Sequence, residues 1–313
     1  MSADWVAASV RARSMAQRRV GAGGSRRLAE QHSLADALLM LADTGYADRL
    51  AGCTDLAVAE RATSDTVLWQ LRVLAGWMPA RGTRLVRAAA GAFERDNIVA
   101  LARRLDGGAA ADNPFDLGAL ATVWPRLRTV ASAEELAEAM RSSTWGDPGS
   151  DGAGSGGTAA LRDVLTLVWL RRLAAVASAA RPWVEAACVL IAARILLVDA
   201  AVPAPRILQL VRPILGRTWE TAGNLAELRA SLPLSAQPVL RGIEAPEELW
   251  RADAGMRAAV EVDGFRLLRG SQPGPDVVLG AIAVLAMDAW RVRAALAAAA
   301  VGTGSSEVLD AVA

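Results

Sequence analysis

The sequence contains no lysine, only one histidine and only two cysteines among its 313 residues. Without lysine, the chain has no phosphate-loop lysine, no Schiff-base lysine and no catalytic lysine pair. His32 alone cannot build a histidine-based metal site, and we expect it at the surface. Cys53 and Cys188 stand far apart and in no CxxC pattern, so we expect buried thiols of a reducing compartment. The sequence therefore predicts no catalytic residue, no cofactor and no metal site.

Aromatic residues are scarce as well, at 4% of the chain, and ten of these fourteen residues are tryptophan. Much of the 53% apolar content is alanine, the best helix former. Runs of β-branched and aromatic residues bounded by turn residues are few, so we expect an all-α fold. The 34 basic residues, all arginine, are balanced by 33 acids. An arginine-rich DNA-binding protein is therefore the least favoured class, because the chain has no overall basic field.

Two stretches are strongly apolar, but both carry charges. Residues 183–202 include Glu185, Arg194 and Asp199, and residues 277–300 include Asp288, Arg291 and Arg293. The longest charge-free part of the second stretch, 277–287, is too short to cross a membrane. We expect both stretches to form helices buried in protein. Residues 1–20 hold four arginines and no apolar core, so they do not indicate a signal peptide.

A short leucine-rich segment that ends in an aromatic residue occurs three times. "SLADALLMLADTGY" covers 33–46, "SAEELAEAMRSSTW" covers 132–145 and "RILQLVRPILGRTW" covers 206–219. Ser33 and Ser132 each stand three residues before an acid, which predicts a helix cap of the capping-box type. In each segment the aromatic residue stands thirteen positions after the first residue of the segment. Three such segments in tandem indicate an internal repeat.

A second kind of helix alternates with these segments. Glu94, Asn97 and Arg103 recur in spacing as Glu185, Cys188 and Arg194. A third helix at 284–300 carries Arg291 and Arg293, with Val284 at the position expected for the acid. Nine residues separate acid and arginine, so the two lie on opposite faces of their helix and cannot pair. We expect the following residues to form interfaces: Glu94, Asn97, Arg103, Glu185, Arg194, Arg291 and Arg293.

Taken in order, these motifs resemble the C-type adaptor protein of bacterial and archaeal V-type ATPases, the counterpart of the d-type adaptor of eukaryotes. "VAASVRARSMAQRRV" at 6–20 is similar to that family's opening helix, and "SLADALLMLADTGYADRL" at 33–50 to its first short segment. "ERDNIVALARRL" at 94–105 resembles its N-L-x-x-L-L-R element. "AWRVRAALAAAA" at 289–300 resembles its closing helix. The resemblance covers nearly the whole chain.

The resemblance implies a funnel of three pseudo-symmetric helical lobes at 1–108, 109–203 and 204–313, with a flexible loop at 146–157. It implies a non-catalytic rotor adaptor that couples the central-stalk subunits to the membrane proteolipid ring during proton or sodium transport. Such an adaptor is cytoplasmic and peripheral to the membrane, and it binds no nucleotide. Arg103 and Arg194 would face the hollow of the funnel or an adjoining lobe.

Two other classes of function remain open from the sequence. A generic α-helical repeat scaffold has the same repetition, but its ends stay far apart, whereas a ring of lobes closes on itself. A helical enzyme could bind Mg²⁺ through Glu247 and Glu248. Because these two acids are adjacent, they point about 100° apart on a helix and fit a solvated first turn better.

Overall fold

The computed structural model describes residues 4–108, 113–149 and 157–311, and within these ranges it consists of helices and turns with no strand. The predicted all-α fold is confirmed. No helix in these ranges combines the length and the apolar character needed to cross a membrane. The chain divides into two compact units. The first unit comprises Met1–Val86 and Ala254–Ala313, and the second comprises Arg87–Asp253.

These unit boundaries differ from the lobe boundaries near 108 and 203 that the family resemblance implies. Each unit contains parts of more than one expected lobe, so the three-lobed repeat stays a prediction. Most of the expected flexible loop at 146–157 lies outside the described residues, since the description stops at 149 and resumes at 157.

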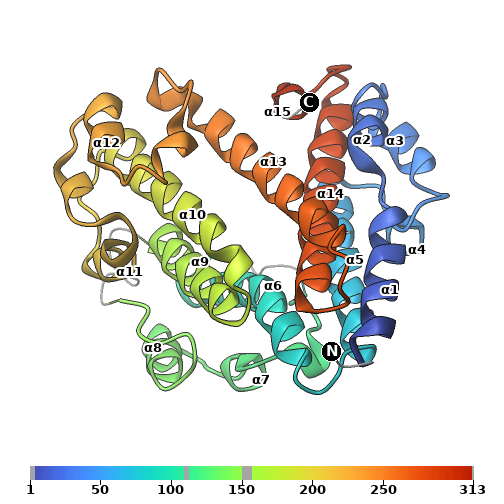
Figure 1. Ribbon diagram of the computed structural model, residues 1–313, viewed down its shortest axis with the longest axis horizontal. Helices are drawn as coiled ribbons and strands as arrows, with labels where there is room; N and C mark the ends of the chain where they lie inside the picture. The colour runs from blue at the N-terminus through green and yellow to red at the C-terminus, as the bar shows by residue number, and fades with distance from the viewer. Residues whose placement is uncertain (1–3, 109–112, 150–156, 312–313) are drawn as a thin grey trace. The chain divides into compact units, whose positions relative to one another are not determined.

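The first unit is built around α14 (Pro275–Val301), the longest helix of the described chain. α14 packs against α1 (Asp4–Gln17), α2 (Gly21–Ala29), α3 (Leu34–Met40) and α5 (Leu56–Gly76), as Figure 1 shows. The unit also contains α4 (Ala47–Leu50) and α15 (Glu307–Asp310). Alanine, valine and leucine fill most of α14, and this charge-poor composition matches its burial on several sides.

Two glycines let α13 (Leu249–Leu268) and α14 touch backbone to backbone in the first unit. A Cβ atom added to Gly280 would lie 2.5 Å from the carbonyl oxygen of Gly264. A Cβ atom on Gly264 would lie 3.0 Å from the carbonyl oxygen of Gly280. Neither position has room for a side chain, because a backbone carbonyl cannot move aside as the end of a flexible side chain can.

The second unit contains the rest of the helices, and α6 and α13 each belong partly to it. The α-helices are α6 (Thr83–Leu105), α7 (Trp124–Leu127), α8 (Ala133–Arg141), α9 (Gly157–Val176), α10 (Arg181–Ala193), α11 (Pro205–Leu215) and α12 (Leu225–Ser231). Short 3₁₀ turns are η1 (Gly118–Leu120), η3 (Ser178–Ala180), η5 (Thr218–Thr221), η6 (Gln237–Leu240) and η7 (Pro246–Glu248), and η4 (Arg194–Val198) is a π turn. Trp145 and Trp219 are the largest fully buried side chains of its core.

Helices α3 and α8 begin directly after the serines that the sequence predicts as N-caps. The Ser33 hydroxyl accepts a hydrogen bond from the Asp36 amide at the start of α3. Ser132 accepts one from the Glu135 amide at the start of α8. Both predicted serine caps are thus confirmed, and the acid three residues later accepts from the Ser33 hydroxyl in the first case and from the Ala131 amide in the second. In each case the helix stops before the aromatic residue, which follows in a turn and points into the core, since Tyr46 and Trp145 are both buried.

Candidate functional site: buried carboxylates and predicted interface residues

Glu94 lies on α6, almost fully buried in the second unit. Its Oε1 accepts hydrogen bonds from the backbone N–H groups of Thr122, Val123 and Trp124 at 2.7, 2.8 and 2.9 Å. Its Oε2 accepts hydrogen bonds from the Thr122 hydroxyl and, at 3.0 Å, from the indole nitrogen of Trp145. The first amides of a helix have no partner within that helix. The Glu94 carboxylate supplies that partner at the start of α7.

The number of donors around Glu94 decides its charge. Burial alone would raise the pKa of this carboxyl, but hydrogen bonds from the Thr122 hydroxyl and from three backbone amides outweigh burial and lower the pKa. Arg172 lies over the Trp145 ring, with its guanidinium carbon 5.0 Å from the ring centroid. Burial lowers the pKa of Arg172, and the negative charge of Glu94 acts against that effect. Glu94 is therefore a buried anion held by polar groups.

A second buried carboxylate, Asp288 of α14, has the same kind of surroundings in the first unit. Its Oδ1 accepts a hydrogen bond from the Gly21 amide at 2.7 Å, and its Oδ2 accepts one from the Val20 amide at 3.1 Å. These amides stand at the start of α2. The Tyr46 hydroxyl donates to Oδ2 at 2.8 Å. Each of the two carboxylates thus binds a helix start and the polar atom of the aromatic residue that lies thirteen positions after a capping serine.

The pKa of Asp288 shifts in the opposite direction. Burial raises the pKa, and the hydrogen bonds from Gly21, Tyr46 and Val20, together with the charge of Arg19, only partly counter burial. The pKa of Tyr46 is raised well above its usual value by burial and by the neighbouring Asp288 carboxylate. The tyrosine therefore stays protonated and acts as a donor to the carboxylate.

Within the described residues, the aromatic residue of the third leucine–aromatic segment makes no such contact with a carboxylate. The indole nitrogen of Trp219 donates instead to the nearby carbonyl oxygen of Gly216 at 3.0 Å. The helix of this segment, α11, begins with Pro205, which has no amide hydrogen to donate. Glu185, the expected counterpart of Glu94, is half-buried and accepts a hydrogen bond from the Ser235 hydroxyl at 2.5 Å. Glu185 does not take the place of Glu94.

The third long helix has no acid at the expected position, Val284, but Asp288 four residues later makes contacts of the same kind as Glu94. If Arg293 of α14 is aligned with Arg103 of α6, Val284 falls at the position of Glu94. Asp288 is the residue whose contacts correspond to those of Glu94. Arg291 then corresponds to Asn97, because each stands three residues after the acid. A sequence signal for this correspondence exists, namely a lone carboxylate directly after the charge-free stretch 277–287.

Asn97 has an internal role in the second unit. Its side-chain amide donates to the carbonyl oxygen of Phe115 at 3.0 Å and accepts from the Phe115 amide at 2.7 Å. Asn97 is 2% exposed. The paired hydrogen bonds attach the segment before α7 to α6 and satisfy both polar groups of one residue, as burial requires. Asn97 and Glu94 are therefore buried and hydrogen-bonded within the second unit, and neither side chain is exposed for binding another protein.

The four predicted interface arginines lie in different surroundings. Arg103 is exposed near the end of α6, on the side opposite buried Glu94, as the helical spacing predicts. Arg293 is exposed and lies 3.7 Å from Glu60. Arg291 is buried and forms an ion pair with Glu261 at 2.6 Å within the first unit. Arg194 is half-buried. Asp163 and Asp199 form ion pairs with it.

No protein-family model and no curated protein matches the chain. The residues themselves therefore carry the functional argument. His32 is exposed, as predicted. Cys188 is buried as predicted, and burial raises its thiol pKa to about 12, whereas Cys53 is only partly buried. No group of three His, Cys, Asp or Glu side chains suited to a metal ion comes together in the described parts of the chain.

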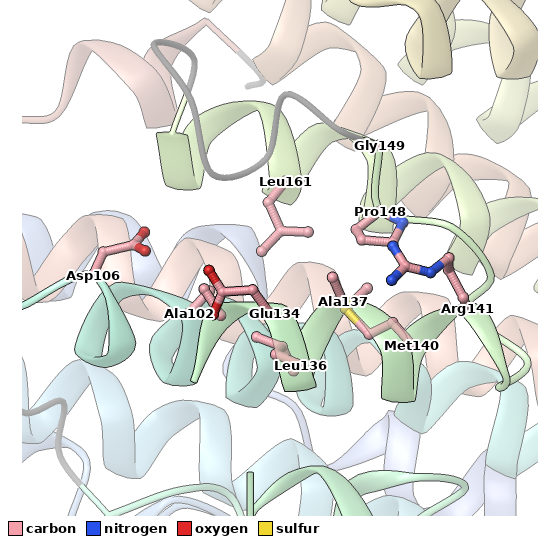
Figure 2. A pocket seen from close by; sticks show the side chains of 11 residues that line it. Ala102, Asp106, Glu134, Leu136, Ala137, Met140, Arg141, Pro148, Gly149 and Leu161 are labelled. Atoms are coloured by element: carbon pink, nitrogen blue, oxygen red, sulfur yellow. The ribbon is translucent and has the colours of Figure 1, made fainter. Parts of the chain in front are cut away.

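A pocket of about 230 Å³ lies beside α8 in the second unit. Figure 2 shows the Asp106 and Glu134 carboxylates on one side of it and Arg141 on the other, with Leu161 between them. Arg141 is occupied by an ion pair with Glu138 at 2.8 Å. The described lining contains no histidine, cysteine, serine or lysine, and its two acids, Asp106 and Glu134, are exposed.

Glu247 and Glu248, the acids considered for Mg²⁺ binding, do not converge on one point. Glu248 pairs with Arg251 at 2.7 Å and accepts a hydrogen bond from the Glu244 amide at 2.9 Å, and Glu247 is exposed. The first of these contacts spans three residues of the same helical segment, as an ordinary solvated first turn does.

Proposed function

We propose that this chain is a non-catalytic rotor adaptor of a V-type ATPase. In this role it couples the central-stalk subunits to the membrane proteolipid ring during proton or sodium transport. It sits on the cytoplasmic side, peripheral to the membrane, as a funnel of three pseudo-symmetric lobes. The proposal rests on the motif resemblance and on the all-α fold, and one structural observation favours it over the scaffold alternative.

That observation is the contact between the first and the last repeat. α14, the last long helix, packs against α1, α2 and α3, and Asp288 binds Tyr46, which is 242 residues away in the chain. In an open solenoid each repeat contacts only its neighbours, so the first and last repeats stay apart. A contact between them is what a closed arrangement of lobes requires.

The repeated carboxylate contact supports the same proposal. Glu94 joins the second long helix of the first repeat to the aromatic segment of the second, and Asp288 joins the last long helix to the aromatic segment of the first. The same chemical link therefore connects one repeat to the next at two places. A structure built from one helical unit used several times is expected to repeat its connections in this way.

Contacts with the stalk would come from the exposed arginines. Arg103 and Arg293 expose their side chains, whereas Arg291, Glu94 and Asn97 are bound internally. An adaptor that is released and recaptured during assembly needs charged contacts that salt weakens. We therefore assign stalk binding in part to Arg103 and Arg293.

The test is a pull-down from host membranes with the tagged full-length chain. We expect the proteolipid and the stalk subunits to co-purify at low ionic strength and to dissociate at about 0.5 M salt, where screening acts within roughly 4 Å. The double variant Arg103→Ala, Arg293→Ala should recover several-fold less stalk protein. Arg269→Ala, also at an exposed position, is the matched control. Recovery of soluble partners without any proteolipid would instead identify a scaffold.

A further inference from the structure

The second unit contains an apolar groove that none of the roles above uses. It has a volume of about 570 Å³ and lies between the end of α10 with the following π turn and the start of α13. Its apolar lining includes Leu190, Ile191, Leu197, Val198 and Trp250. Val198 is 54% exposed although it is part of this lining. An open apolar surface of this kind is typical of a binding site for another molecule.

The backbone beneath the groove is unusual. Residues 194–198 form a π turn, and Ala200, just after it, has a φ angle of 47°, the only positive value for a residue other than glycine in the described chain. Both features cost conformational energy, and both are common at functional sites. Here the wide turn brings Leu197 and Val198 to the groove together with Arg194.

The charges around the groove are predominantly negative. Its charged lining residues are Arg194, Glu247 and Asp253. Arg194 is already engaged by two carboxylates, those of Asp163 and Asp199. Arg251 also lies at the groove, with its guanidinium carbon 5.3 Å from the centroid of the Trp250 ring, and it pairs with Glu248. The lining residues and these neighbours thus include five acids and two arginines, although the whole chain has a net charge of +1. An apolar groove with an acidic rim complements an apolar surface flanked by cations.

We propose that this groove binds a basic amphipathic helix of a partner protein. The helix would place an apolar stripe against Leu190, Leu197 and Trp250, and a flanking arginine or lysine side chain would contact Glu247. Helix-in-groove recognition uses this combination of an apolar stripe and a charged border. The proposal does not depend on the rotary role, because it concerns a surface formed by the second unit alone.

The test uses the full-length chain and a fluorescent 18-residue peptide with a leucine stripe and lysine flanks, followed by fluorescence anisotropy at low salt. We expect binding that weakens as the salt concentration rises. Val198→Lys should weaken binding about tenfold, because it removes an apolar contact and adds a like charge. Glu247→Lys should weaken it about threefold. Both positions are exposed, so both variants should keep the wild-type melting temperature.

Matched variants separate the groove from the rest of the surface. Val176→Lys changes a valine of similar exposure, 44%, at the end of α9, and Glu244→Lys changes another exposed acid outside the lining. Both should bind the peptide like wild type. The proposal fails if the wild-type protein does not bind the peptide, or if the controls lose as much affinity as the groove variants. It also fails if a peptide with glutamate flanks binds equally well, or if hexylamine displaces the peptide at equal concentration, which would indicate a small-molecule site.

Discussion

Glu94 in the second unit and Asp288 in the first perform the same task with different numbers of partners. Each carboxylate binds the start of a helix and the polar atom of a buried aromatic residue. In the described residues, Glu94 accepts five hydrogen bonds, whereas Asp288 accepts three. The pKa of Glu94 is lowered and that of Asp288 is raised, although both side chains are 1% exposed. Burial alone therefore does not decide the direction in which the pKa of a carboxylate shifts; the number of donors that face the carboxylate also counts.

The donors also differ in kind, and this difference has energetic consequences. The hydroxyl of Tyr46 can rotate and accept a hydrogen bond, whereas the indole of Trp145 can only donate. Asp288 can therefore lose its charge while its aromatic partner adapts. Glu94 has less of this freedom, because three backbone amides and an indole around it can only donate, and the Thr122 hydroxyl is its one partner that can also accept.

The largest expected effect comes from neutralising each carboxylate without changing its shape. Glu94→Gln places an NH₂ group beside the Trp145 indole or the three backbone amides, which can only donate, so we expect a loss of about 3 kcal/mol in the free energy of unfolding. Asp288→Asn should cost only about 1 kcal/mol, because Tyr46 can accept from the new amide. Chemical denaturation measures both losses. Faster amide hydrogen exchange at the start of α7 for Glu94→Gln, and at the start of α2 for Asp288→Asn, would show where each loss arises. Glu134→Gln, at an exposed helix start, is the control. Equal losses at Glu94 and Asp288 would contradict the comparison.

Shortening the aromatic partners should give the next largest effect. Trp145→Phe removes the indole donor and leaves a cavity in the core, for which we expect a loss of about 2 kcal/mol. Tyr46→Phe removes only a hydroxyl and should cost about 1 kcal/mol. Thermal and chemical unfolding give these values. A double-mutant cycle that combines Trp145→Phe with Glu94→Gln should show coupling, and strict additivity would mean that the two side chains act independently.

The pH dependence of these losses should have opposite signs at the two sites. The folded pKa of Glu94 is below its ordinary value of 4.5, so its contribution is present above pH 4.5 and is lost as the pH falls through the folded pKa. The folded pKa of Asp288 is above 3.8, so its contribution is present below pH 3.8 and is lost as the pH rises through the folded pKa. Between about pH 6 and about pH 3, the cost of Glu94→Gln should shrink and that of Asp288→Asn should grow. Unfolding free energies measured at several pH values test this, and parallel trends would refute it.

The smallest expected effect concerns the segment that lacks a carboxylate. Pro205→Ala adds an amide hydrogen at the start of α11, where no acid accepts it, and makes the unfolded chain more flexible. Since Pro205 is exposed, water can bind the new amide, and we expect a loss of about 0.5 kcal/mol. A loss above about 2 kcal/mol, measured by chemical denaturation, would show that the proline has a role beyond the missing donor.

Local features of the fold were predictable from the sequence. Ser33 and Ser132 cap their helices as expected, and Tyr46 and Trp145 are buried after them, because capping and helical periodicity act over a few residues. The role of Asp288 was not predictable in this way. Its partners, Val20, Gly21 and Tyr46, are more than 240 residues away, and no local pattern brings them together.

The arginines show the same limit of local reasoning. The spacing of Glu94 and Arg103 predicted opposite faces, and the two residues are indeed buried and exposed respectively. The sequence did not distinguish Arg291, buried in an ion pair with Glu261, from exposed Arg293 two residues later. That distinction depends on how α14 packs against α13, which is a property of tertiary contacts.

The first unit consists of the two ends of the chain, and this has a consequence for the order of folding during synthesis. Residues 1–86 leave the ribosome before the second unit, whereas α14, the helix on which α1, α2, α3 and α5 pack, leaves after it. At about 5–20 residues per second, α1–α5 wait roughly 10 s or longer for that helix. The continuous second unit is complete before then. The exit order thus gives the second unit time to fold first, while the faces of α1, α2, α3 and α5 that pack on α14 remain uncovered.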